Sequence, residues 1–326
     1  MKKISDLNAF IITDEELKET IECIGWKRLI SELRKGFEQS ASGLVVAPEK
    51  VYVDTGVSDM RCMPAYLPGY RTEYCGVKVV STAPENKKHG LPTVLGEYLL
   101  RDAETQRLVA VMQAEEMTAY RTGAATGVAT EVLSRSDCNT LGIIGTGKQA
   151  PYQAKAILTV RPAINRIKVF NTSEQRAIQF KADYEAEWGI DIAVVDLEEA
   201  VDSDIVTTVT TATEPFISPE LIAPGMHLNG VGADSKTKIE FDPRVLKKAR
   251  IVVDDLSQCM HSGEIYQGLE KGVLKKADLI PLGDVLLGNA KGRTGDDDIT
   301  FFKSTGVAFE DLITAVLVFE ELRSSR

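Results

Sequence analysis

The stretch that decides the fold is Asn139–Ala150, which reads Asn-Thr-Leu-Gly-Ile-Ile-Gly-Thr-Gly-Lys-Gln-Ala. Its apolar run Leu141–Ile144 predicts a buried strand, and a helical pattern begins at about Lys148. The glycines between them lie on a strand-to-helix turn and fit the G-x-G-x-x-G/A pattern of dinucleotide-binding sites. In that pattern Gly145 makes the tight turn and Gly147 lets the backbone approach a pyrophosphate, which the helix N-terminus also attracts.

The chain that follows supplies the context that such a turn requires. From residue 141 to about residue 255, strand-like runs alternate with helices or turns, as in a doubly wound parallel sheet. A glycine-rich turn in another kind of α/β protein is the alternative, and the alternation favours the dinucleotide site. The strands are expected at residues 141–144, 166–170, 192–195, 205–209, 227–231 and 251–253.

The residues after the second of these strands bear on the choice of dinucleotide. An NAD site of this kind is expected to carry Asp or Glu there, bound to the ribose 2′-hydroxyl. Here the chain reads Asn171-Thr172-Ser173, followed by Arg176, so hydroxyls and a cation are available to bind a 2′-phosphate. The sequence therefore favours NADP(H) over NAD(H). The alternative, which is compatible with it, is that Thr172 or Ser173 caps the next helix.

Length and composition exclude several classes of protein. The chain has 326 residues, which is enough for two domains or one large domain, and 44% of them are hydrophobic. Its net charge of −10, without a basic block, argues against nucleic acids and anionic membranes as partners. No apolar run approaches the roughly 18 residues of a membrane span, and the first residues lack a signal-peptide core.

The cysteines and histidines predict a cytoplasmic protein without a structural metal. The five cysteines are scattered, odd in number and without C-x-x-C pairs, which is typical of free thiols in a reducing compartment. The three histidines do not have the spacing of metal ligands. These residues are Cys23, Cys62, Cys75, Cys138, Cys259, His89, His227 and His261.

The part of the chain before the glycine-rich turn has a different pattern. Residues 13–40 predict two helices broken near Gly25, and residues 46–112 predict short strands separated by Gly, Pro and Asn turns. Short strands with short connections imply antiparallel or mixed pairing. Lys50, Arg61 and Lys78 lie within these apolar runs. Each of them either faces solvent or, with the other two, lines a pocket for an anion.

Two further polar residues stand out. Arg121 lies on a helix of small residues expected at 114–134, and a partly buried Arg needs an acid or a ligand carboxylate. Asp234 follows the strand at 227–231, near where a nicotinamide ring would lie in a doubly wound sheet. It is either a general acid/base, or a group for a substrate ammonium, or an ordinary turn Asp. Helices are expected around 262–271, 277–287 and 309–322, and a strand at 299–303.

Taken together, these motifs resemble the ornithine cyclodeaminase/μ-crystallin family over nearly the whole chain. The resemblance implies a homodimer in which a central Rossmann domain, residues 126–302, joins an α+β domain for substrate binding and dimerisation, residues 1–125 with the return of 303–326. The motifs are Lys50-Val-Tyr, Arg61-Cys-Met-Pro-Ala, Gly76-Val-Lys78, Gly90-Leu-Pro-Thr-Val, Arg121-Thr-Gly-Ala, Gly145-Thr-Gly-Lys-Gln-Ala, Gly232-Ala-Asp234, Val252-Val-Asp-Asp255 and Phe302-Lys-Ser-Thr-Gly306-Val-Ala.

The resemblance also implies roles for individual residues. Arg61, Lys78 and Arg121 would hold a substrate carboxylate, Lys78 would lie near the reacting carbon, and Asp234 would activate water or handle the proton of the amino group. The remaining roles are those of a dinucleotide site. They fall on Gly145, Thr146, Gly147, Lys148 and Gln149 for the pyrophosphate, on Asn171, Thr172, Ser173 and Arg176 for the ribose, on Thr210, Val231 and Gly232 for the nicotinamide, and on Ser304 and Gly306 near it.

The same motifs discriminate between branches of the family. Ornithine cyclodeaminases carry Glu where this chain has Arg61, and ketimine reductases of the μ-crystallin type lack the acid found here as Asp234. The Lys50 motif is similar to that of alanine dehydrogenases, whereas Asn171 is similar to the NADPH-using branch. The prediction is an NAD(P)-dependent oxidoreductase of a small α-imino or α-amino acid. The alternatives are an ornithine or lysine cyclodeaminase that uses NAD catalytically, and a dinucleotide-binding carrier without activity.

Overall fold

The computed structural model describes residues 2–4, 9–71 and 73–325 and divides the chain into two compact units. The first unit comprises Met1–Arg121 and Val307–Arg326, and the second comprises Thr122–Gly306. The chain leaves the first unit within helix α3 (Glu115–Leu133) and returns to it after Gly306. The divisions therefore fall at 121/122 and 306/307, where the sequence suggested 125/126 and 302/303.

A mixed sheet of seven strands forms the body of the first unit, in the order β1-β2-β7-β6-β5-β4-β3. Neighbouring strands are antiparallel except β2 and β7, which run parallel. The prediction of antiparallel or mixed pairing is thus confirmed, although β1 and β2 were not foreseen because such short runs show too little alternation. The strands are β1 (Lys2–Ile4), β2 (Ala9–Ile12), β3 (Val51–Asp54), β4 (Asp59–Tyr66), β5 (Tyr74–Thr82), β6 (Val94–Asp102) and β7 (Leu108–Gln113).

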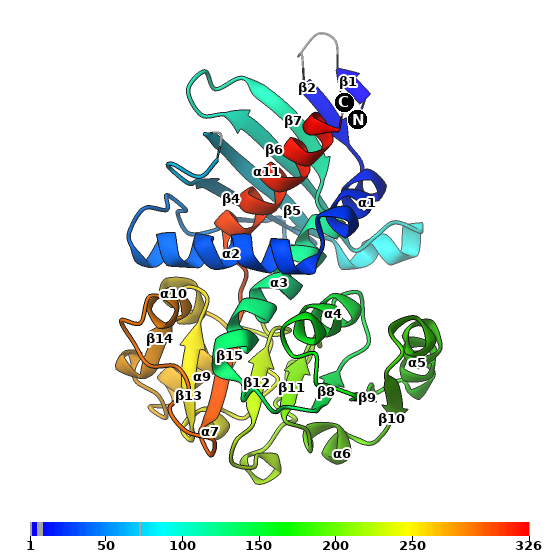
Figure 1. Ribbon diagram of the computed structural model, residues 1–326, viewed down its shortest axis with the longest axis vertical. Helices are drawn as coiled ribbons and strands as arrows, with labels where there is room; N and C mark the ends of the chain where they lie inside the picture. The colour runs from blue at the N-terminus through cyan, green and yellow to red at the C-terminus, as the bar shows by residue number, and fades with distance from the viewer. Residues whose placement is uncertain (1, 5–8, 72, 326) are drawn as a thin grey trace. The chain divides into compact units, whose positions relative to one another are not determined.

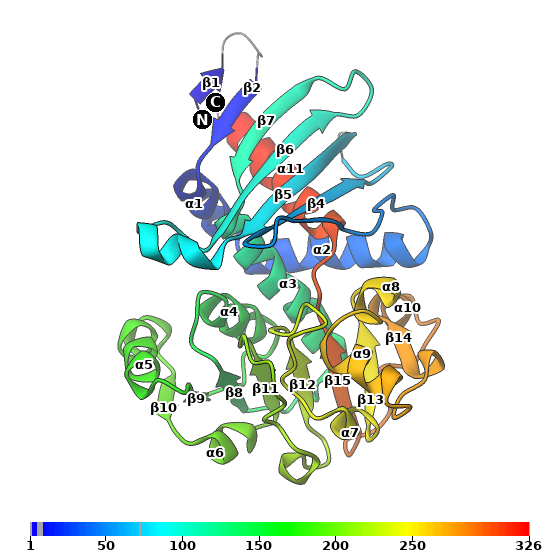
Figure 2. The same ribbon diagram turned by 180° about the vertical axis from the view of Figure 1, so that it is seen from behind.

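Three helices cover one face of this sheet: α1 (Asp14–Ile24), α2 (Trp26–Ala41) and α11 (Ala308–Ser324) (Figure 1). Thr13 caps α1 in a reciprocal pair with Glu16, and the chain breaks between α1 and α2 at Gly25, as the sequence predicts. Helix α11 contacts β4, β5 and β6 as well as α1 and α2. Seen from behind, the strands have no described helix over their other face (Figure 2).

A parallel sheet of eight strands forms the second unit, in the order β10-β9-β8-β11-β12-β15-β13-β14. Every neighbouring pair is parallel, so the predicted doubly wound domain is confirmed. The strands are β8 (Thr140–Ile144), β9 (Arg166–Phe170), β10 (Asp191–Val194), β11 (Ile205–Thr208), β12 (His227–Gly230), β13 (Ala249–Val253), β14 (Leu279–Pro281) and β15 (Ile299–Lys303).

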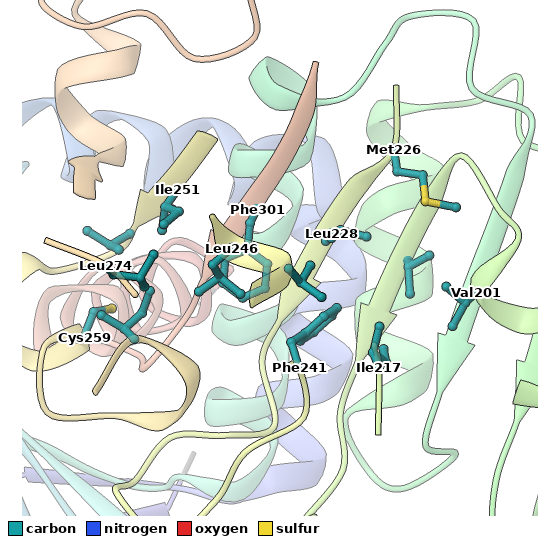
Figure 3. Close-up of a cluster of buried hydrophobic side chains, with 14 of the residues drawn as sticks. Val201, Ile217, Met226, Leu228, Phe241, Leu246, Ile251, Cys259, Leu274 and Phe301 are labelled. Carbon is teal, nitrogen blue, oxygen red and sulfur yellow. The ribbon is translucent and has the colours of Figure 1, made fainter. Parts of the chain in front are cut away.

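Helices pack on both faces of the parallel sheet and bury two apolar clusters. One cluster lies against α4 (Ala150–Val160) and α5 (Glu174–Trp188). The other lies against α6 (Leu197–Val201) and α9 (Gly263–Glu270), and Figure 3 shows its side chains gathered around Phe241 and Phe301. These two rings meet edge to face, with their centroids 5.1 Å apart. The short helices α7 (Pro243–Leu246), α8 (Leu256–Cys259) and α10 (Leu282–Leu286) complete the unit.

One expected element is wrong. The sequence suggested a single helix over 277–287, but this stretch contains a 3-10 turn, strand β14 and the short helix α10. Pro281 explains the difference, because proline disfavours helical geometry in the residue before it and is tolerated in an edge strand or at the start of a helix. The apolar spacing of these residues could not distinguish the two arrangements.

Candidate active site

A buried ionic cluster lies in the first unit, between strand β5 and helices α3 and α11. The Lys78 ammonium contacts Asp311 Oδ1 at 2.8 Å, and Arg121 Nε contacts the same oxygen at 3.0 Å. Arg121 also pairs with Glu310 Oε2 at 2.7 Å, and Lys78 reaches Thr118 Oγ1 at 3.4 Å. Lys78 and Asp311 are 1% and 0% exposed, so these charges are almost fully removed from water. The structure therefore brings together two of the predicted carboxylate-binding residues.

The register of the sheet places a third predicted residue on the same face. Lys78 lies opposite Met63, and Arg61 precedes Met63 by two residues, so its side chain points to the same side. The Arg61 guanidinium contacts Asp59 Oδ1 at 2.9 Å and lies 5.5 Å from the centre of the Tyr52 ring. It is half-buried and has polar contacts of its own, so a ligand would share it with Asp59.

Burial and nearby charges lower the pKa of the Lys78 ammonium. Burial is the main cause that lowers the pKa of Lys78 to about 8, and the nearby charges of Arg121 and Lys50 add to it. Asp311 acts in the opposite direction. Lys50, half-buried just before β3, is close enough to influence the pKa of Lys78.

Two buried polar atoms in and beside this cluster have no hydrogen-bond partner among the described residues. They are Asp311 Oδ2 and the Tyr98 hydroxyl. Burial, together with Asp311, holds the pKa of Tyr98 well above its usual value, so its hydroxyl keeps its proton. An unsatisfied buried polar group costs about 1–3 kcal/mol. A bound carboxylic acid or an ordered water would relieve that cost.

Sequence reasoning missed Glu310 and Asp311, which are central to this cluster. They stand in the first turn of α11, where acids are common because they favour the helix dipole. Both are fully buried, however, between apolar neighbours such as Phe309 and Leu312. Two adjacent acids inside an otherwise apolar helix were the available signal, and they needed buried cations as partners.

The second unit carries the predicted dinucleotide turn between β8 and α4. Gly145 has a φ of 93°, a conformation that favours glycine, and its N–H donates to the Phe170 carbonyl at 2.9 Å. Gly147 is exposed, and a Cβ placed there would meet nothing within 4 Å. Gln149 Oε1 is buried without a partner, while Lys148 is exposed. Open backbone before a helix N-terminus fits the pyrophosphate of a dinucleotide.

The predicted ribose residues surround the end of β9. Asn171 Nδ2 donates to Thr146 Oγ1 at 2.6 Å, which ties this strand end to the glycine-rich turn. Asn171 Oδ1 accepts the Ser173 N–H at 3.2 Å and the Thr172 hydroxyl at 3.4 Å. Arg176 is exposed in the first turn of α5. The predicted side-chain cap by Ser173 is absent, since Ser173 is the N-cap residue without a side-chain bond.

The predicted nicotinamide residues lie at the carboxyl ends of three neighbouring strands. Thr210 follows β11, and the Val231 and Gly232 N–H groups both donate to the Thr208 carbonyl, at 3.1 and 3.2 Å. Ser304 follows β15, where its buried hydroxyl has no partner. The Gly306 N–H donates to Asp254 Oδ2 at 2.7 Å, which fixes the turn after Ser304.

Asp234 lies in the loop after β12 and is half-buried. Lys238 Nζ contacts its Oδ1 at 2.7 Å, and both side chains are 30% exposed. The contact with Lys238 helps to orient the Asp234 carboxylate. The sequence named Asp234 but not its cationic neighbour.

Two further observations concern metal sites and membrane-spanning helices. Within residues 2–4, 9–71 and 73–325, no group of three or more His, Cys, Asp or Glu side chains is arranged to hold a metal ion. The same part of the chain has no helix that is both long and apolar enough to span a bilayer.

Comparison with known proteins identifies the family and agrees with the fold. The family model described as ornithine cyclodeaminase/mu-crystallin family matches residues 14–326. An alanine dehydrogenase of Archaeoglobus fulgidus is 37% identical over 98% of this chain and 96% of its own length. A solved archaeal alanine dehydrogenase dimer with bound NAD superposes with a TM-score of 0.92 at 37% identity, covering 97% of both chains. The Δ1-pyrroline-2-carboxylate reductase of Thermococcus litoralis, solved with NADH and L-proline, gives 0.91 at 34% identity, with 97% of this chain and 98% of that one covered.

Proposed function

Because this chain belongs to the ornithine cyclodeaminase/mu-crystallin family, we propose that it is a nicotinamide-dependent oxidoreductase of small α-imino or α-amino acids. The observation that carries the proposal is the buried contact of Lys78 and Arg121 with one oxygen of Asp311. Two cations held together in this way are suited to bind the α-carboxylate of a substrate. The relatives named above act on alanine or on a cyclic imino acid, which fits such a site.

In this proposal each residue has a limited task. A bound dinucleotide supplies the hydride that reaches the substrate α-carbon. Arg121 and Lys78, helped by Arg61 and Lys50, hold the carboxylate and so fix the orientation of the α-carbon. Asp234, held by Lys238, gives the substrate nitrogen the proton that turns C=N into CH–NH, or removes it in the opposite direction.

We propose that the dinucleotide is NADP(H) rather than NAD(H). The support is the lack of a carboxylate at the end of β9, where Asn171 stands, and the exposed Arg176 one turn later. A carboxylate there would repel a 2′-phosphate, whereas Arg pairs with one. We expect Arg176→Ala to weaken NADPH binding about tenfold or more and to leave NADH binding unchanged. Titration of the intrinsic NADPH and NADH fluorescence measures both, and equal losses would contradict the assignment.

We also propose a homodimer in the cytoplasm. The uncovered face of the first unit's sheet carries a patch of apolar side chains that are only partly buried within one chain. They are Cys62, Val77, Val79, Leu99 and Val111. The archaeal relative was solved as a dimer, which supports a second copy as the cover. All five cysteines are free thiols, which suits a reducing compartment.

The proposed function is tested by following nicotinamide absorbance with NADPH and with NADH. Pyruvate plus ammonia and Δ1-pyrroline-2-carboxylate are offered in parallel. Oxidation with either substrate is expected, and the better one tells whether the open-chain or the cyclic imino acid is preferred. Ammonia release from ornithine without net change in nicotinamide would instead indicate a cyclodeaminase. Dinucleotide binding without either reaction would indicate a carrier.

A further inference from the structure

A second buried ionic cluster lies under the predicted nicotinamide residues, and the reaction scheme above leaves it unused. It consists of Glu240, Glu264 and Lys303, each 0% exposed. Glu240 Oε1 accepts the Thr210 N–H at 2.7 Å, and Glu240 Oε2 accepts the Gly232 N–H at 2.9 Å. One carboxylate thus holds the backbone at the ends of both β11 and β12.

Gly232 packs so closely against its neighbours that a residue with a side chain would not fit at this position. A Cβ on Gly232 would collide with the Thr210 carbonyl oxygen and with Glu240 Oε1. The Thr208 hydroxyl donates to Glu240 Oε2 at 2.8 Å, so the carboxylate receives donors on both oxygens. A backbone N–H can only donate, so neither of these two N–H groups could accept a hydrogen bond from a protonated Glu240. The geometry therefore suits an ionised Glu240 carboxylate.

Glu264, on α9, contacts both Glu240 and Lys303. Its Oε1 accepts the Glu240 N–H at 2.8 Å, and its Oε2 contacts Lys303 Nζ at 2.8 Å. Lys303 is the last residue of β15 and directly precedes Ser304. Phe241, next to Glu240, is anchored in the apolar cluster of Figure 3. The cluster is thus fixed to the carboxyl ends of β11, β12 and β15 and to the apolar cluster around Phe241.

The cluster contains two carboxylates and one ammonium, so its net charge is −1 when Glu240 is ionised. Burial lowers the pKa of Lys303, but Glu264 and Glu240 outweigh this and raise it above its ordinary value, so the ammonium stays charged. Burial, and then Glu264, raise the pKa of Glu240. Charges buried in this way are screened little by salt and act over several ångströms.

We propose that the Glu240–Glu264–Lys303 cluster places a negative charge behind the nicotinamide site and so favours the oxidised, cationic ring over the reduced, neutral ring. The inference rests on the proposed function, because it takes Thr210 and Gly232 as the residues that line that site. Glu240 acts here as a positioning residue: it touches the backbone of the site and not the substrate. On the protein, the cluster would thereby shift the equilibrium of the bound pair toward the oxidised dinucleotide and the amino acid, which is the direction of imino-acid reduction.

The test is the Glu240→Gln variant, which keeps the shape and removes one charge. Dissociation constants of NADPH and NADP+, and of NADH and NAD+, are measured by fluorescence titration and by competition. Two unit charges about 10 Å apart in a protein interior change an equilibrium constant about tenfold. We therefore expect the ratio of the reduced to the oxidised dissociation constant to fall about tenfold in the variant.

Asp204→Asn is the matched control. Asp204 also binds two backbone N–H groups, those of Asn139 at 2.8 Å and Thr140 at 3.1 Å, and it pairs with Arg135. It lies at the amino end of β8 and β11, which is the opposite edge of the same sheet. We expect Asp204→Asn to lower the free energy of unfolding without changing the ratio of the reduced to the oxidised dissociation constant. Equal weakening of both redox forms by Glu240→Gln, or no change in either, would overturn the inference.

A measurement on the unaltered protein guards against failure of the variant to fold. Glu240 loses its charge as the pH falls through its raised pKa, so the preference for the oxidised ring should decline toward acid pH. The charged groups that face Glu240 are Glu264 from α9 and Lys303 from β15. Lys303 also lies near the titratable thiol of Cys259 on α8. Groups on the dinucleotide itself titrate alike in both redox forms and cancel in the ratio. If the variant does not fold and the ratio in the unaltered protein is independent of pH over the whole range in which that protein stays folded, the inference is contradicted. Absence of dinucleotide binding would instead contradict the proposed function itself.

Discussion

Asp311 is the acid that favours the charged form of Lys78 in the proposed substrate site. Its carboxylate contacts Lys78 and Arg121 and opposes the burial that lowers the pKa of Lys78 to about 8. If protonated Lys78 binds the substrate carboxylate, kcat/KM for reduction should fall as the pH rises above about 8. Asp311→Asn should move this fall to lower pH by at least about one pH unit, since an opposite charge is lost.

The pH profile of kcat/KM, measured with both proteins at saturating dinucleotide, checks this prediction. Glu32→Gln is a suitable control, because Glu32 is also a buried carboxylate of the first unit, bound to Arg71 and Tyr70. Its profile should match that of the unaltered chain. If Asp311→Asn leaves the alkaline fall in place, Lys78 does not set it.

Asp234 is tested in a different way, because its proposed task begins only after the dinucleotide has bound. Asp234→Asn should lower kcat by about 10²–10⁴-fold, since a positioned proton donor is lost. The dissociation constant of the dinucleotide should stay within about twofold, which fluorescence titration measures. Unchanged turnover would show that the pair with Lys238, at 2.7 Å, is only structural.

At the level of elements, the turn between β8 and α4 offers a paired test. Gly147→Ala adds a methyl group in open space, so stability should not change, but a pyrophosphate would meet it and binding should weaken. Gly145→Ala should lower the free energy of unfolding by about 1–3 kcal/mol, because its φ is 93° and Val209 O lies 3.0 Å from the added Cβ. Urea unfolding and dinucleotide titration of both variants separate the two effects. Equal behaviour of the variants would contradict the assignment.

The same turn shows which elements a sequence can predict. Strand, glycines and helix follow each other within a dozen residues, so local pattern was enough, and the capped start of α1 was predictable for the same reason. Strand β14 was missed because Pro281 lies inside an apolar spacing that also fits a helix. Asp311 was missed because its partner Lys78 is 233 residues away, and no local pattern reports such a contact. The family resemblance pointed to the cations Lys78 and Arg121, whereas their acidic partners Glu310 and Asp311 were found only from the packing of the structure.

At the level of the whole molecule, the apolar outer face of the first unit's sheet predicts the assembly. Val77→Lys would place a charge on that face opposite the uncharged Pro64 and Leu99, so the chain should become monomeric at micromolar concentration because burying an unpaired charge is costly. Ile178→Lys is the control, since Ile178 is already 45% exposed on α5 of the second unit. Sedimentation velocity distinguishes the states. A dimer that survives Val77→Lys would place the interface elsewhere.

The central claim is that this chain moves a hydride between nicotinamide and the α-carbon of a small imino acid. It is tested most directly with NADPH, or NADH, deuterated at C4, and either pyruvate plus ammonia or Δ1-pyrroline-2-carboxylate. We predict that mass spectrometry finds one deuterium at the α-carbon of the alanine or proline formed, in step with oxidation of the dinucleotide. Product without deuterium, or deuterium that returns to the dinucleotide while ornithine loses ammonia, would contradict the claim.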